Sequence, residues 1–260
     1  MLKIKYKDKK NQIYNVPKNN SKKGFVRVLY GDSKDEKSCS VTEEIKCKFR
    51  SYGDDMDFYI NKIDYFVMGK NNYDLLKHLG AKKVFLVSKK PFIHKEKITS
   101  YYNKTFLINE AIKEFDEILF TDFDCRKNRK IDDEIWEVIK LDKKKKYGVQ
   151  FCMVERKKTN FHHRKESRKI GSCSCLVYCA DKYFHNHFLN IYDEYYNRFY
   201  GKTVRRITGD EVVLLYAVDT YFSNGSYFNN KQLIKYFDSN IIETRSCCVK
   251  NKPNIYFSHR

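Results

Sequence analysis

The sequence predicts an α/β fold in which a mixed, mostly parallel sheet is flanked by helices. Short runs rich in β-branched and aromatic residues alternate along the chain with amphipathic helical patterns. The order strand, helix, strand, helix, strand favours parallel pairing, because a parallel crossover needs an intervening element. The 260 residues, 42% of them apolar and 16% aromatic, are enough to build one large core.

The first elements follow a basic segment. Residues 1–24 are rich in lysine and show little apolar periodicity, so we interpret them as a basic arm or an edge hairpin, and residues 25–260 as one domain. The first strand is predicted at 25–30. A second strand region covers 58–60 and 65–68 and ends at Gly69.

The next elements lead to a pair of aspartates. A short helix is predicted at 73–79, capped by Asn71 or Asn72 and ended by Gly80. A strand follows at 84–88, and a longer helix runs over 104–115 with apolar residues four apart. The apolar run after it ends in Asp122 and Asp124.

The second half of the chain continues the same alternation, with one strongly basic interruption. Segment 155–169 carries seven lysines and arginines against two glutamates and has no apolar pattern, so we interpret it as a mobile basic loop. The other predicted elements are a helix at 135–139, strands at 147–154 and 171–178, helices at 184–199, 210–218 and 232–237, and a last strand at 254–257.

The Asp-x-Asp sequence is the main candidate site. Side chains alternate along an extended segment, so Asp122 and Asp124 are expected on one side and Phe123 on the other. Two carboxylates aimed together repel unless a cation lies between them, and hard oxygen ligands suit Mg²⁺ or Mn²⁺. The alternative is a polar turn in which both aspartates are solvated or cap the next helix.

The charge and the cysteines limit the class of protein. The net charge of +19 favours a polyanionic partner, such as nucleic acid, an acidic glycan or an anionic membrane surface, or it reflects the lysine bias of an AT-rich genome. No signal peptide or membrane-length apolar run is found, and nine cysteines without a disulfide framework fit reduced thiols. We therefore expect a cytoplasmic protein without a transmembrane segment, with peripheral membrane contact still open.

Three segments carry a resemblance to a known family. Residues 102–112 followed by 116–124 resemble the Lys-helix-strand-Asp-x-Asp segment of GT-A fold glycosyltransferases. Residues 171–178 are similar to the small-residue strand of their acceptor wall, although Cys173 and Cys175 stand where many members carry Gly or Asn. Residues 208–214 look like their Asp-Glu at a helix start. The resemblance implies a GT-A-like sheet, and it does not identify a subfamily; a viral or phage member is one interpretation, which would place the protein in the host cytoplasm.

The resemblance implies a metal site and a donor site. Asp122 and Asp124 would hold Mn²⁺ or Mg²⁺ against the diphosphate of a nucleotide sugar, a UDP-sugar first among them, and His259 would complete the metal site. In the donor site, Tyr30 would stack on the nucleobase, Asp32 would accept a hydrogen bond, and Lys104 would reach the diphosphate. The alternative for His259 is a disordered terminal histidine, and the alternative for Tyr30 is an ordinary aromatic residue of the sheet. The alternative for Lys104 is a solvated lysine.

On the acceptor side, the resemblance implies a carboxylate base. Asp210 or Glu211 would take the proton of the acceptor hydroxyl, although Thr208 to Glu211 also fits a capping box. The basic loop favours an anionic acceptor, either a surface glycan or a modified base in DNA. A non-catalytic basic nucleic-acid-binding protein is the alternative function. The candidate acceptor-binding residues are Lys157, Lys158, His162, His163, Arg164, Lys165 and Arg168.

Overall fold

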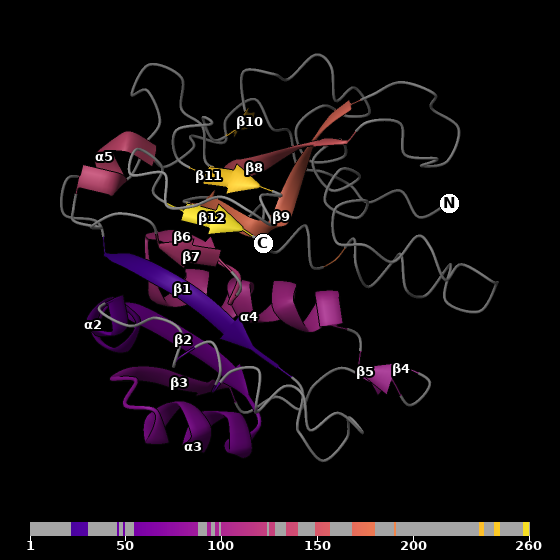
Figure 1. Cartoon of the computed structure of the whole chain (residues 1–260). Helices are drawn as coiled ribbons and strands as arrows, with labels where there is room; N and C mark the ends of the chain where they lie inside the picture. Colours follow the sequence, from indigo (N-terminus) through magenta and orange to yellow (C-terminus); the bar gives the residue numbers. More distant parts are fainter. Residues whose placement is uncertain are drawn as a thin grey trace.

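The computed structural model describes residues 22–30, 46, 49, 55–87, 93–94, 97–98, 100–123, 125–127, 134–139, 149–156, 168–179, 190, 234–236, 242–244 and 257–259. Its main feature is a seven-stranded sheet with the order β10-β8-β9-β6-β1-β2-β3 (Figure 1). The strands of this sheet are β1 (Lys23–Leu29), β2 (Ile63–Met68), β3 (Lys83–Val87), β6 (Glu117–Thr121), β8 (Val149–Arg156), β9 (Arg168–Cys179) and β10 (Ile234–Tyr236).

The sheet is mixed and mostly parallel, as the sequence predicts. Strands β6, β1, β2 and β3 run parallel to one another, and β10 runs parallel to β8. Strand β9 is antiparallel to both β6 and β8. The remaining strands form a three-stranded sheet of β11 (Ile242–Thr244), β12 (Phe257–His259) and β7 (Cys125–Lys127), and a hairpin of β4 (Ile93–His94) and β5 (Lys97–Ile98).

Helices cover both faces of the parallel part. Helix α4 (Ser100–Glu114) packs on β1, β2 and β6. Helices α2 (Met56–Asn61) and α3 (Lys70–His78) supply residues to the core cluster on the other face, and α5 (Glu134–Ile139) joins that face through Trp136, whose ring lies 4.9 Å from that of Phe25. Every residue of β2 is buried, as expected for a parallel strand with both faces covered.

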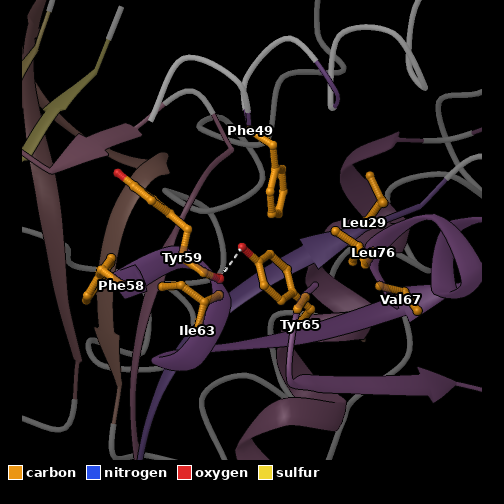
Figure 2. Packing of buried hydrophobic residues seen from close by; sticks show 9 residues of the cluster. Leu29, Phe49, Phe58, Tyr59, Ile63, Tyr65, Val67 and Leu76 are labelled. Atoms are coloured by element: carbon orange, nitrogen blue, oxygen red, sulfur yellow. Dashed lines mark hydrogen bonds between the residues drawn. The ribbon is translucent and has the colours of Figure 1, made fainter. Parts of the chain in front are cut away.

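The core cluster on the α2 and α3 side is rich in aromatic residues (Figure 2). The Tyr65 hydroxyl donates a hydrogen bond to the Tyr59 carbonyl at 2.9 Å, so the buried phenol has a partner. The members of the cluster are Leu29, Phe49, Phe58, Tyr59, Ile63, Tyr65, Val67, Leu76 and Ala81. Because α2 and β2 share this cluster, the short helix is fixed against the sheet.

Two predicted elements have the wrong type. Residues 56–61 form helix α2 instead of a strand, because Phe58 and Tyr59 both bury their rings in the core cluster from a helix, and aromatic preference for strands is a packing preference. Residues 234–236, predicted as helical, form β10, because the edge of β8 offers them parallel backbone pairing.

Three predicted boundaries also change. The cap of α3 is Gly69, at φ 84°, while Asn72 lies inside the helix and donates to the Met68 carbonyl; Gly80, at φ 92°, ends the helix region as predicted. The basic loop is shorter than 155–169, because Glu155 pairs with Lys169 and Arg156 with Arg168 in the β8–β9 ladder. The last strand is β12, at 257–259.

The other predicted helices and strands are confirmed within a few residues at each end. Of the predicted helix at 184–199, only Asn190 is described, and it is helical. The predicted helix at 210–218 and most of the amino-terminal arm lie outside the described residues. No helix in the described part of the chain is long and apolar enough to cross a membrane.

Candidate active site

The candidate site lies at the edge of the sheet where the parallel strands end. Asp122 follows the last residue of β6, Tyr30 follows β1 and Gly69 follows β2. Since the carboxyl ends of parallel strands meet at one edge, these positions share that edge. Tyr30 is half-buried there, which is compatible both with stacking on a nucleobase and with an ordinary aromatic residue of the sheet.

The Asp-x-Asp sequence lies on a turn, which corrects the extended geometry predicted for it. Strand β6 ends at Thr121, and the Cys125 amide donates to the Asp122 carbonyl at 3.1 Å. This bond closes a four-residue turn between β6 and β7. The alternation rule for strands therefore does not fix the direction of Asp124, which lies outside the described residues.

Lys104 holds the first aspartate. Its Nζ lies 3.2 Å from Asp122 Oδ2, and the lysine side chain is 5% exposed while that of Asp122 is 22% exposed. The same Nζ lies 5.6 Å from the centre of the Phe120 ring. The alternative of a solvated lysine is therefore wrong, because α4 buries Lys104 against the end of β6.

Arg27 holds the same turn from the other face of the sheet, and the sequence analysis did not identify it. The guanidinium is fully buried. Its Nε donates to Thr121 Oγ1 at 3.1 Å, one terminal nitrogen donates to the Cys125 carbonyl at 2.6 Å, and the other lies 3.5 Å from the Phe123 carbonyl. A lone basic residue inside the apolar run of β1 was the available signal.

Strand β7 is fixed to helix α2. The Lys127 amide donates to the Tyr59 hydroxyl at 2.9 Å, and the Lys127 ammonium forms an ion pair with Asp55. The Lys127 side chain is 11% exposed, so this pair is shielded from water on one side. The turn at Asp122 is thus fixed by contacts at Thr121, at Asp122 and Phe123, and at Cys125 and Lys127.

The pairing of β12 brings His259 to this turn. Strand β12 runs antiparallel to β7, with Phe257 opposite Lys127 and His259 opposite Cys125. Phe257 is buried and anchors the strand. His259 is therefore at the register position next to Asp124, although the two are far apart in sequence.

The β8–β9 hairpin extends past the same edge. Leu176 to Cys179 pair with β6, and the earlier part of β9 continues beyond the carboxyl end of β6, where it pairs with β8 alone (Figure 1). Arg156, which ends β8, and Arg168, which begins β9, therefore lie past the edge of the sheet that carries Asp122.

The other predicted site residues are not tested by the geometry. Arg168 begins β9. Asp32, Asp124, Asp210, Glu211 and the candidates from Lys157 to Lys165 lie outside the described residues, as do the side chains of Arg168 and His259. Within the described side chains, no three His, Cys, Asp or Glu residues gather as metal ligands. Cys125 and Cys179 are buried thiols.

This chain resembles known proteins in its structure, and no match is found from its sequence. No protein-family model matches the sequence, and no curated protein matches it. The structure of mouse xyloside xylosyltransferase 1 superposes with a TM-score of 0.52 at 9% identity, covering 92% of this chain and 97% of that chain. A glycosyltransferase involved in the glycosylation of the major capsid of PBCV-1 gives a TM-score of 0.45 at 10% identity, covering 90% and 92%.

The likeness to the xylosyltransferase extends over nearly the whole of both chains. At 9% identity it shows the fold alone. The predicted α/β fold with a mostly parallel sheet and flanking helices is therefore confirmed, both by the strand order and by this comparison.

Proposed function

We propose that the chain is a metal-dependent glycosyltransferase that moves a sugar from a nucleotide sugar to an acceptor hydroxyl. The observation that carries this proposal is the pairing of β12 with β7, which brings His259 beside the Asp122 turn. Two carboxylates and an imidazole form a donor set that suits Mn²⁺. The fold likeness to a xylosyltransferase supports the same class of reaction.

The residues of the turn fit such a metal. Asp122, Asp124 and His259 would hold Mn²⁺ or Mg²⁺, which when bound offsets the negative charge of the departing nucleoside diphosphate. Lys104 neutralises Asp122 before the donor binds, because its ammonium lies 3.2 Å from that carboxylate. From the same position it donates to a phosphate oxygen of the donor. Tyr30 and Asp32, at and after the end of β1, bind the nucleoside of a UDP-sugar.

The acceptor binds on the side of the basic connection. Arg156 and Arg168, the paired residues at the end of the β8–β9 ladder, lie past the edge that carries Asp122, and residues 157–167 connect them in the sequence. The lysines, arginines and histidines of this connection bind an anionic acceptor, either a glycan or a modified base in DNA. Asp210 or Glu211 removes the proton from the acceptor hydroxyl.

Release of UDP from a panel of UDP-sugars, with and without Mn²⁺, tests this function. We expect release to require Mn²⁺ or Mg²⁺ and to fall at least about a hundredfold in both Asp122→Asn and Asp124→Asn, because each loses a charged ligand. Asp57→Asn is the matched control, since Asp57 is an exposed carboxylate on α2 and should be neutral to activity.

Metal-independent release, or full activity of Asp122→Asn, would contradict the proposal. Duplex DNA binding that survives both substitutions, with no release from any UDP-sugar, would favour the non-catalytic nucleic-acid-binding protein instead. Mass spectrometry of DNA nucleosides and of an acidic glycan after the reaction identifies the acceptor.

A further inference from the structure

We infer that Arg27 is a positioning residue for the metal site, because its buried guanidinium fixes the backbone of the turn that carries Asp122. The inference rests on the proposed function. It adds a residue that lies in a strand separate from all the proposed metal ligands.

The burial of Arg27 first requires an explanation. Arg27 lies on β1, between β6 and β2, and its side chain is 0% exposed. A guanidinium removed from water is costly unless its donors find acceptors with good geometry. A strand that needed only a core residue at this position would carry an apolar side chain, like its neighbours Val26 and Val28. The cost of burying the Arg27 guanidinium is therefore offset by the hydrogen bonds that it donates.

The acceptors of Arg27 span the whole turn. Thr121 Oγ1 is at the end of β6, the Phe123 carbonyl is within the turn, and the Cys125 carbonyl is at the start of β7. The rigid, planar fork of arginine can hold several acceptors in one fixed geometry, which the ammonium of lysine cannot. One side chain thus sets the backbone on both sides of Asp124.

Two aromatic rings fix the plane of the fork. The guanidinium carbon lies 4.7 Å from the centre of the Tyr59 ring and 5.5 Å from that of Phe123. The Phe123 ring in turn lies 5.8 Å from that of Tyr65 in the core cluster. The middle residue of Asp-x-Asp is therefore packed inward against Arg27, and it takes part in holding the turn.

The turn is held from both faces of the sheet. Lys104, on α4, binds the Asp122 side chain from one face, and Arg27 binds Thr121 and the following carbonyls from the other. Metal affinity depends on ligands held near their bound geometry before the metal arrives, and outer residues that orient ligands typically change affinity 10- to 100-fold. Arg27 would be such an outer residue for Asp122 and Asp124, because it fixes the backbone that carries them.

The test measures Mn²⁺ binding directly. The dissociation constant of Mn²⁺ alone is obtained from the electron paramagnetic resonance signal of free Mn²⁺, at a temperature well below the thermal unfolding midpoint of each variant. We expect Arg27→Lys to raise this constant about 10- to 100-fold. Thr121→Val, which keeps Arg27 and removes one acceptor, should raise it about 3- to 10-fold.

Val26→Ala is the matched control for lost stability. Val26 is the neighbouring residue of β1, is equally buried and points to the opposite face of the strand. Its truncation should lower the unfolding midpoint and leave Mn²⁺ binding within about twofold. If Arg27 served only stability, Arg27→Lys would likewise lower the unfolding midpoint and leave Mn²⁺ binding within about twofold.

Each result decides the inference. Mn²⁺ binding by Arg27→Lys and Thr121→Val within twofold of the unaltered chain would overturn it. Where Arg27→Lys does not fold, the Thr121→Val constant decides alone. An unaltered chain that binds no Mn²⁺ would overturn the proposed function and this inference together, whereas binding by the unaltered chain and equally by both variants would overturn the inference only.

Discussion

Asp64 is a buried carboxyl whose ionisation opposes folding. It is 3% exposed, and burial raises its pKa from 3.8 to about 6 even though Lys83 Nζ lies 3.7 Å away and a backbone hydrogen bond from Phe25 favours the charged form. The folded chain thus holds this proton over a pH range in which the unfolded chain has released it. Stability from this group is complete below about pH 4 and is lost as the pH rises through about 6.

Asp64→Asn should therefore stabilise the protein at neutral pH. The amide cannot ionise and keeps an acceptor oxygen for Phe25, so we expect a gain of roughly 1–3 kcal/mol above pH 6 and little gain near pH 4. Urea unfolding at pH 4.5 and 7.5 measures the difference. Asp74→Asn, which removes an exposed i,i+4 pair with Lys70, should change stability little at either pH. An equal effect of Asp64→Asn at both pH values would contradict this.

Gly24 is a residue where close packing excludes a side chain. A Cβ at this position would lie 2.9 Å from two atoms of the buried Phe115 ring. Gly24→Ala should therefore destabilise the chain by about 1–3 kcal/mol. Chemical denaturation measures the loss, and Phe115→Leu in the same chain should relieve part of it. Full additivity of the two substitutions would contradict a clash between them.

At the scale of elements, β12 pairs with β7, the strand that follows the Asp122 turn. His259 and Ser258 are neighbours on this strand, and side chains of neighbouring strand residues point to opposite faces. We expect His259→Ala to weaken Mn²⁺ binding at least about tenfold and Ser258→Ala to leave it unchanged. Isothermal titration with Mn²⁺ measures both. Unchanged binding in His259→Ala would remove this residue from the metal site while leaving the aspartates in it.

The predictability of the elements follows from whether their signals are local. The strands at β1, β2, β3 and β6 and helix α4 carry continuous apolar runs or a 3.6-residue period, and the sequence predicts all of them. Helix α2 and strand β10 are short, and their type is decided by the partners they meet in the folded chain. The types predicted for these two elements are therefore wrong.

The candidate site divides in the same way. Lys104 lies on α4 and Asp122 directly follows β6, and both elements carry strong local patterns, so their places at the end of the sheet could be predicted although their ion pair was not. Arg27 contacts residues 94 to 98 positions away, so its place inside the apolar run of β1 could mark it as unusual but could not show which residues it binds. The pairing of β12 with β7 is likewise a tertiary contact. The sequence could therefore suggest His259 only as a hypothesis, and the structure shows that this residue lies beside the turn.

At the scale of the whole molecule, the net charge of +19 has two explanations that its placement can separate. If the charge is compositional, lysines at any surface contribute equally to polyanion binding. If it serves an acceptor, those leaving the β8–β9 hairpin at the Asp122 edge contribute most. The described chain offers a matched set at the opposite edge, where Lys62, Lys77, Lys82 and Lys113 are exposed near the amino ends of the strands.

Two variants with equal loss of charge test this. Replacement of Lys157, Lys158, Arg164 and Lys165 by Gln should weaken binding to duplex DNA or to an acidic glycan at least about tenfold and reduce its salt dependence, because fewer counterions are released. Replacement of Lys62, Lys77, Lys82 and Lys113 by Gln should weaken it less than about threefold. Fluorescence anisotropy across a salt series measures both, with UDP release as the check that the donor site is intact. Equal weakening in the two variants would mean that the charge acts through its sum, and the proposed acceptor site would then have to be sought away from the β8–β9 hairpin.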